Sequence, residues 1–130
     1  LSETMLFGNQ PFIADMTAAA VSAPSPVAAG MAARFAARAA LVRSRLHGVA
    51  GLAVSDPQAG MFVLVDVRAV SASGRAFAER LLRDRGVAVM PGESFGPALA
   101  GWLRLSLTQP DDLTATACDR IADLARQMTS

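Results

Sequence analysis

The spacing of apolar residues changes from a helical period to a strand period after Gly48, and this change constrains the fold more than any other feature. Residues 27–47 predict one long amphipathic helix with an apolar stripe of Met31, Phe35, Ala39, Val42 and Leu46. Residues 61–70 instead alternate, with Met61, Val63, Val65 and Val67 on one face and Phe62, Leu64 and Asp66 on the other. A chain that contains both periods is expected to fold as an α+β domain.

The remaining segments up to Gly86 give the order of the first elements. A helix is predicted over 11–22, and the stretch 23–26, which contains two prolines, separates it from the long helix, whose Arg34, Arg38 and Arg45 are expected on the surface. Residues 49–54 are predicted to form a strand that pairs with 61–70 in a hairpin. The next helix is expected to begin after Ser73, to reach about Arg85 and to bury Phe77, Leu81 and Leu82.

Two further strands and a helix complete the predicted domain. Residues 86–90 and 102–108 have strand character, and a stretch rich in glycine and proline, 91–101, joins them. The last helix is expected from about Thr108, with Asp111 as a capping-box-like partner and a core stripe of Leu113, Ala117, Ile121, Leu124 and Met128. The predicted fold is therefore two N-terminal helices followed by ββαββα, with a small, mostly antiparallel sheet covered by helices.

The composition excludes several classes of protein. The 130 residues are 52% hydrophobic and 18% charged, which suffices for one compact core, and no run approaches the roughly 18 apolar residues of a membrane span. A net charge of +1 without a basic cluster argues against a nucleic-acid partner, and a single cysteine allows neither an internal disulfide nor a paired-cysteine metal site. All 12 basic residues are arginines, so no lysine is present to form a Schiff base.

Arg104 is the residue whose position most suggests a function. Alternation in 102–108 places Leu103, Leu105 and Leu107 on one face of the strand and Arg104 on the other. An arginine in the middle of a strand needs a partner for its charge, and its planar guanidinium suits bidentate binding of a carboxylate. The structural alternatives are an ion pair within the chain, with Asp66 or Glu93, or a solvated sheet face.

Other polar residues are expected to be structural. His47 is placed at a helix end, Cys118 is interpreted as a small buried side chain, and the adjacent Asp111 and Asp112 are interpreted as charges at a helix N-terminus. The stretch 91–101 lacks the spacing of a phosphate-binding loop, and Ser94 has no histidine nearby in the sequence for a catalytic triad. No catalytic, cofactor-binding or metal-binding residue is predicted within the chain.

Three motifs in fixed order resemble a known family. The segments DPQAGMFVLVDVR (56–68), AERLLRDRGVAVMPGESFG (78–96) and GWLRLSLT (101–108), followed by an amphipathic helix, are similar to the C-terminal part of class I/II pyridoxal-phosphate-dependent aminotransferases. These are fold-type-I enzymes of the aspartate aminotransferase group. The opening LFGNQPFIAD is nearest to broad-specificity or arginine/pyruvate-type members.

The resemblance implies a division of roles between this chain and a larger protein. It makes Arg104 the arginine that binds the substrate α-carboxylate, and it places Phe7 in a loop that lines the neighbouring subunit's substrate pocket. Residues 1–26 would be a connecting loop and helix packed on a large domain, and 27–130 the C-terminal small domain. The Schiff-base lysine for pyridoxal phosphate would lie upstream, so the chain alone should be inactive. The intact enzyme is expected to be a cytoplasmic homodimer that transfers an amino group from an amino acid to a 2-oxo acid.

Two interpretations of other classes stay open at the level of sequence. The chain could be a free-standing, non-catalytic α+β module that grips a small carboxylate through Arg104. It could also be a dimerisation module, in which the alanine-rich helices 11–22 and 27–47 pair with a second copy.

Overall fold

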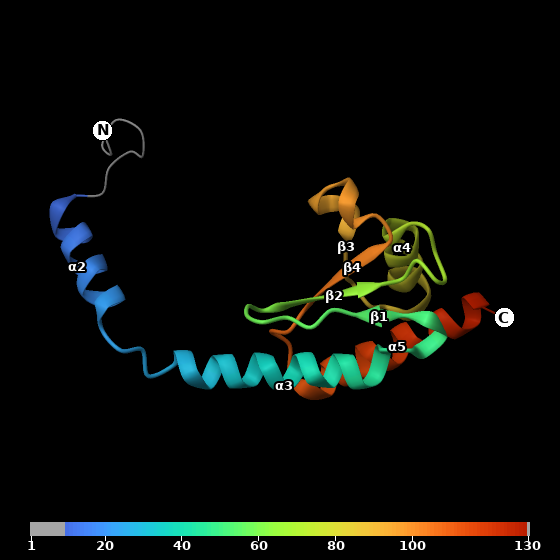
Figure 1. The fold of residues 1–130 in the computed structure, drawn as a ribbon, viewed down its shortest axis with the longest axis horizontal. Coiled ribbons are helices and arrows are strands. Elements are labelled where there is room, and N and C mark those ends of the chain that lie inside the picture. Colours follow the sequence, from blue (N-terminus) through green and yellow to red (C-terminus); the bar gives the residue numbers. More distant parts are fainter. Residues whose placement is uncertain (1–9, 130) are drawn as a thin grey trace. The chain divides into compact units, whose positions relative to one another are not determined.

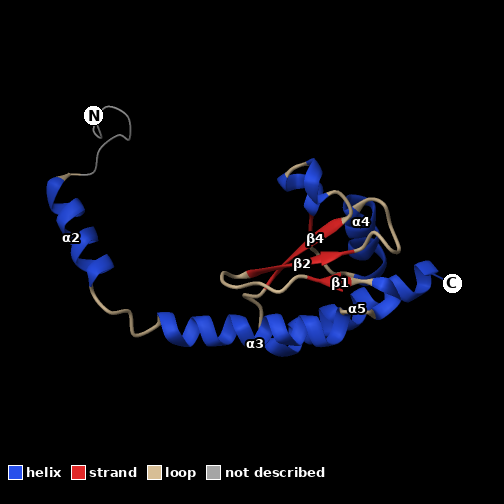
Figure 2. Ribbon diagram, in the orientation of Figure 1, coloured by secondary structure: helices blue, strands red, loops and turns tan. Residues whose placement is uncertain are grey.

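The computed structural model describes residues 10–129, which divide into two units at Gly30 and Met31. In the described residues, the chain forms the elements α2 (Pro11–Ser22), α3 (Ala28–Leu46), β1 (Ala53–Val54), β2 (Phe62–Asp66), α4 (Gly74–Arg85), β3 (Met90–Pro91), β4 (Trp102–Ser106) and α5 (Asp111–Thr129), with the short 3-10 helices η1 (Val49–Gly51), η2 (Gly92–Phe95) and η3 (Pro97–Leu99) (Figures 1 and 2). The predicted α+β fold and its element order are confirmed.

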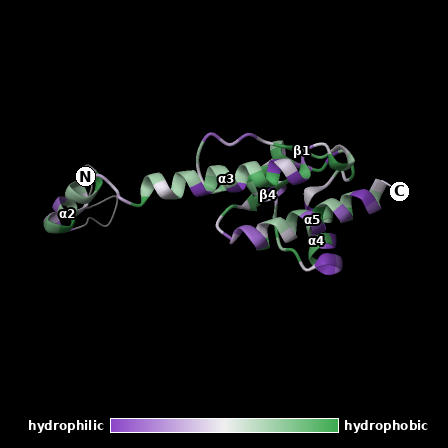
Figure 3. Cartoon of the chain, turned by 90° about the horizontal axis from the view of Figure 1, so that it is seen from below, coloured by the Kyte–Doolittle hydropathy of each residue, from purple (hydrophilic) through white to green (hydrophobic). Residues whose placement is uncertain are grey.

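Helix α2 is the main element of the first unit, and all of its side chains are exposed. Proline at its first position fixes a helical φ where no backbone donor is needed. Its surface is nevertheless strongly apolar, as the green colouring in Figure 3 shows. Phe12, Met16 and Val21 are 58%, 67% and 81% exposed. Exposed apolar side chains at this density are typical of a surface that packs on another protein part.

The second unit is built on a four-stranded sheet in which every neighbouring pair is antiparallel. The strand order is β1-β2-β4-β3, so β2 and β4 are central. Five residue pairs join β2 to β4, among them Leu64 with Arg104. On the other side of β4, Met90 is the partner of Arg104.

One face of this sheet forms the hydrophobic core, and the other does not. Leu103, Leu105 and Val63 are buried on the core face, together with side chains from all three helices α3, α4 and α5. Arg104 and Leu64 lie on the opposite face and are only half-buried. Within the described residues, the helices therefore cover a single face, and the face that carries Arg104 stays partly open.

Arg38 ties α3 to the end of β4 and to the start of α5. Its Nη1 donates to the carbonyl oxygen of Leu107 over 2.8 Å, and its Nε donates to Asp111 Oδ1 over 2.6 Å. The side chain is only 18% exposed, so the expectation of a surface arginine is wrong at this position. Asp111 is itself the first helical residue and accepts from Arg38, so the capping-box-like role is wrong too.

Three predicted boundaries are wrong because local turns interrupt the expected elements. Residues 49–51 form a 3-10 turn instead of a strand, since Gly48 and Gly51 have φ of +84° and +80°. Val87 belongs to the C-terminal cap of α4, where its N–H bonds to Leu81, so the strand expected from 86 begins only at Met90. Helix α5 begins at Asp111 rather than near Thr108.

Three residues assigned to core stripes are exposed. Met31, Leu82 and Leu113 have exposed fractions of 40%, 55% and 54%. Each lies at an edge of its helical stripe, where a small rotation of the helix decides between core and solvent. Among the described helices, none combines the length and the hydropathy that a membrane span needs.

The adjacent leucines of α4 provide a matched test of this packing. We expect Leu81→Ala, at a fully buried position, to lower the free energy of unfolding by about 2–5 kcal/mol, because it leaves a cavity. Leu82→Ala, at the exposed position, should change it by less than about 0.5 kcal/mol. Urea unfolding of the 130-residue chain measures both, and equal losses would contradict the orientation of α4.

Candidate functional site

Arg104 lies in the middle of β4, and the alternation of the strand directs its side chain away from the core. Its neighbours Leu103 and Leu105 are buried on the other face. The hydrogen-bonded strands on both sides hold the Arg104 backbone in place through Leu64 and Met90. Arg104 therefore places a positive charge on a rigid strand in the centre of the sheet. Its position in the middle of a strand is the one that the sequence predicts.

Two phenyl rings flank the guanidinium group. The guanidinium carbon lies 4.0 Å from the ring centroid of Phe62, on β2, and 4.1 Å from that of Phe95, in η2. At this distance the negative face of an aromatic ring attracts a cation. The Nε atom of Arg104 is buried and has no hydrogen-bond partner. The rings thus hold this side chain without a hydrogen bond at Nε.

The two carboxylates proposed as internal partners of Arg104 are engaged elsewhere. Asp66 accepts from Arg68, whose Nε lies 2.9 Å from Oδ1, and this hydrogen bond lowers the pKa of Asp66 against the opposing effect of burial. Arg68 also lies over the ring of Trp102, 5.4 Å from its centroid. Glu93 accepts hydrogen bonds from backbone groups instead of from an arginine. Among the described residues, no carboxylate forms a salt bridge with Arg104.

A shallow hollow of about 170 Å³ opens beside Arg104. It is lined by Phe62, Ala88, Val89, Met90, Arg104 and Ser106. Phe62, Met90 and Phe95 are 38%, 44% and 45% exposed, so apolar surface surrounds the cation. A low-polarity surrounding strengthens the attraction between a guanidinium and an anion. The arrangement suits a small molecule that carries a carboxylate.

Glu93 holds the loop that carries Phe95. Its Oε1 accepts from the N–H of Gly74 over 2.8 Å, from Ser73 Oγ over 3.3 Å and from the N–H of Gly101 over 3.4 Å. Burial by itself raises the pKa of Glu93, but hydrogen bonds from backbone N–H groups outweigh it and hold the pKa below its ordinary value of 4.5. The carboxylate is therefore charged at neutral pH.

The other residues singled out in the sequence are not brought to this site. His47 Nδ1 accepts from the N–H of Val54 at 3.2 Å, and Cys118 is fully buried, which raises the pKa of its thiol to about 11. Asp111 accepts from Arg38 at the start of α5. Phe7 lies outside the described residues. The described residues contain no group of three or more His, Cys, Asp or Glu side chains placed to hold a metal ion.

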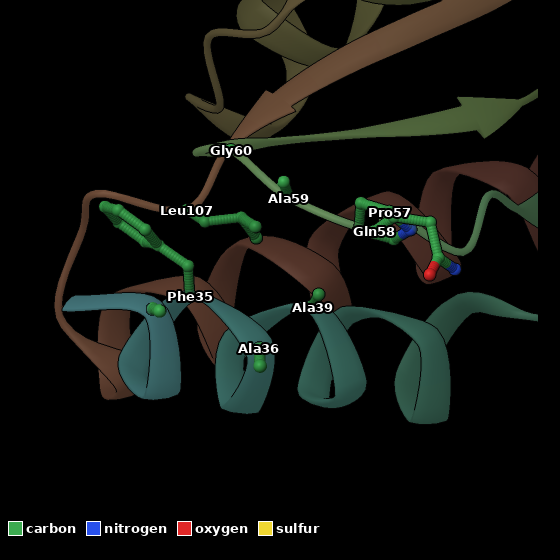
Figure 4. A pocket seen from close by; sticks show the side chains of 9 residues that line it. Phe35, Ala36, Ala39, Pro57, Gln58, Ala59, Gly60 and Leu107 are labelled. Carbon is green, nitrogen blue, oxygen red and sulfur yellow. The ribbon is translucent and has the colours of Figure 1, made fainter. Parts of the chain in front are cut away.

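A second cavity, of about 180 Å³, lies between α3 and the connection from β1 to β2. Figure 4 shows it between Phe35, Ala36 and Ala39 on one side and the segment 57–60 on the other, with Leu107 at one end. Its only polar side chain is that of Gln58, and none of its lining residues is charged. It offers no group for acid–base or nucleophilic chemistry.

Comparison with known proteins connects this geometry to a family. The sequence model of class I and II aminotransferases matches residues 1–121, which include Arg104 and the loop of Glu93 and Phe95. The chain belongs to this family. The expected resemblance is confirmed.

Individual relatives agree with this assignment. The arginine–pyruvate transaminase of Pseudomonas aeruginosa is 41% identical over 128 residues, which are 98% of this chain and 33% of that protein. An LL-diaminopimelate aminotransferase of Dehalococcoides mccartyi is 40% identical over 62 residues, 48% of this chain and 16% of its own length. The solved aromatic aminotransferase of Pyrococcus horikoshii has a TM-score of 0.68 and 26% identity, covering 74% of this chain and 25% of that one. The chain spans a third or less of the length of these relatives.

Membership in this aminotransferase family implies pyridoxal phosphate, and the residues present do not hold it covalently. The cofactor is held by a Schiff base to a lysine, and the chain contains no lysine. The part that these residues can supply is a carboxylate-binding group, because Arg104 lies beside an open hollow and forms no salt bridge with the described carboxylates.

Sequence reasoning missed the two ring partners of Arg104. The alternation predicts the correct face for Phe62, opposite that of Met61 and Val63, but the contact of Phe62 with Arg104 depends on the pairing of β2 with β4. That pairing sets Phe62 opposite Ser106, diagonal to Arg104 on the same face. Phe95 reaches the arginine from a loop, and no periodic pattern signals such a contact.

The lowered pKa of Glu93 predicts a stability difference that depends on pH. A carboxylate with a depressed pKa in the folded state contributes stability above its unfolded pKa, about 4.5, and loses it as the pH falls through the folded value. We expect the 130-residue chain with Glu93→Gln to be less stable than the wild type at pH 7, and the gap to shrink towards pH 3. Urea unfolding from pH 3 to 7 measures the gap.

The exposed Glu79→Gln, on α4, is the matched control and should change the free energy of unfolding by less than about 0.5 kcal/mol. A gap between wild type and Glu93→Gln that stays constant over the whole pH range would show that the charge of Glu93 contributes nothing.

Proposed function

We propose that this chain is the C-terminal small domain of a pyridoxal-phosphate-dependent aminotransferase and that Arg104 binds the α-carboxylate of its substrates. The observation that carries the proposal is a cation on a central strand with no carboxylate partner in the described residues, beside an open hollow. In a protein, a guanidinium in an apolar setting needs an anion, and a substrate carboxylate supplies one.

The role of Arg104 in this proposal is to bind and orient. Its forked N–H groups can donate to the two oxygens of a carboxylate side by side, which fixes the direction of the substrate as well as its position. Phe62 and Phe95 lie on two sides of the guanidinium, so a ligand has to approach from a remaining side. A group held in this way contributes mainly through orientation of the reacting atoms.

The substrates proposed for the whole enzyme are an amino acid and a 2-oxo acid. The similarity to an arginine–pyruvate transaminase supports L-arginine and pyruvate as the first pair to assay. Pyridoxal phosphate supplies the site that accepts and returns the amino group in such enzymes, and its lysine would lie in a part of the protein outside these 130 residues. Without that part, we expect the chain to be inactive.

We also propose a place in the whole enzyme for each of the two parts of the chain. Residues 1–26 would pack on the large, cofactor-binding domain, and 27–130 would form the small domain. The exposed apolar side chains of α2 support a covering partner, because Met16 and Val21 would otherwise stay in water. A homodimer in the cytoplasm, with Phe7 near the partner's substrate pocket, is the arrangement that the family resemblance implies.

Substitution of Arg104 in the full-length enzyme tests the proposed function. We expect Arg104→Ala to lower kcat/KM for the preferred amino acid by about 100-fold or more, because a desolvated ion pair with the carboxylate is lost. The amine that remains when that carboxylate is removed, agmatine in the case of arginine, should react equally slowly with both enzymes. Steady-state kinetics with the two substrates measure the difference.

Arg83→Ala is the matched control, because Arg83 is 74% exposed on α4. It should keep kcat/KM within about 2-fold, as expected for a surface substitution. If the Arg104→Ala enzyme still favours the amino acid over its amine as strongly as the wild type does, the proposed role of Arg104 in carboxylate binding is wrong.

A further inference from the structure

The loop that carries Phe95 is anchored by a single side chain, that of Glu93. Its Oε1 receives three donors from two separate places, the start of α4 at Ser73 and Gly74 and the residue before β4, Gly101. Ser73 also caps α4, since its Oγ accepts from the N–H of Ala76. One carboxylate thus joins the loop, a helix start and the entry to the central strand.

The backbone packs closely around the Glu93 carboxylate, at two positions that are occupied by glycine. A Cβ atom on Gly74 would lie 2.2 Å from the carbonyl oxygen of Trp102 and 2.9 Å from Glu93 Oε2. A Cβ on Gly92 would lie 2.2 Å from the carbonyl oxygen of Leu99. Both positions therefore require glycine, and the loop packs tightly against the beginning of β4. Glu93 is the side chain that fixes this contact.

Glu93 and Phe95 are neighbours in the same turn, and Arg104 follows Gly101 by three residues. The anchor therefore connects the loop that bears the ring to the strand that bears the cation. Phe62, the other ring, is set by the pairing of β2 with β4 and needs no such anchor. Because Nε of Arg104 has no hydrogen-bond partner, the orientation of the guanidinium depends on these rings.

We propose that Glu93 is a positioning residue: by anchoring the loop, it holds Phe95 against Arg104 and so fixes the guanidinium in the orientation that receives a substrate carboxylate. This inference rests on the proposed function and adds two residues to it. A guanidinium that is already oriented loses less conformational entropy when the carboxylate binds, so the effect falls on substrate binding. Glu93 and Phe95 have no assigned part in the chemical step.

Substitutions in the full-length enzyme separate this role from general stability. Phe95→Leu removes the ring from a 45% exposed position, so the variant is expected to fold. It should raise KM for the preferred amino acid roughly 2- to 30-fold, the range of a cation–π contact, and leave kcat within about 2-fold. Phe95→Tyr keeps a ring and should restore the wild-type KM. Glu93→Gln should raise KM in the same direction.

A double-mutant cycle tests whether Glu93 acts through Phe95. If it does, the enzyme with both Glu93→Gln and Phe95→Leu should have the same KM as Phe95→Leu alone, since the anchor then has no ring to place. Exposed Glu79→Gln, on α4, is the control for loss of a carboxylate and should leave KM unchanged. Thermal unfolding of each variant shows whether a change in KM accompanies loss of fold.

The outcomes distinguish the two proposals. If the increases in KM of the two single variants multiply in the double variant, Glu93 does not act through Phe95 and the inference is overturned. A fall in kcat with unchanged KM would overturn it as well. If Arg104→Ala abolishes the preference for amino acid over amine while Glu93→Gln and Phe95→Leu bind like the wild type, only the positioning inference fails. If Arg104→Ala keeps the preference, the proposed function fails first.

Discussion

The structure depends on the burial of one face of β4. Leu103 and Leu105 of β4, and Leu107 directly after it, are at most 7% exposed and lie in the core that α3, α4 and α5 share with the sheet. A slip of one residue would expose all three leucines and bury Arg104 in their place. The cost of such a slip fixes the register of the central strand, and with it the position of the arginine. The same apolar contacts that stabilise the domain therefore place its cation.

The charged side chains on and near the open face of the sheet differ in the groups that they contact. Asp66 binds Arg68, and Oε1 of Glu93 accepts from backbone N–H groups, so neither carboxylate forms a salt bridge with Arg104. Arg104 contacts phenyl rings, which attract a cation without neutralising its charge. This division leaves the guanidinium without a salt bridge among the described residues.

Much of the fold follows from periodic patterns, and the errors occur where those patterns end. The alternation at β4 and the cap at Ser73 are local features, and the structure has them as predicted. The apolar pattern predicts Val87 in a strand, yet its N–H completes the cap of α4. Leu82 and Leu113 lie at the edges of helical stripes, and only the packing of the whole helix decides whether their side chains are buried or exposed.

The sequence by itself determined the family, the order of helices and strands, and the face of β4 on which Arg104 lies, because each depends on residues close together in the chain. Tertiary structure alone decided what surrounds that arginine. Phe62 comes from a strand 42 positions before Arg104, and its contact requires the β2–β4 register. Phe95 arrives through a loop that Glu93 anchors to Ser73, Gly74 and Gly101. Contacts between separate elements depend on how the entire core packs. A local sequence pattern carries no information about that packing.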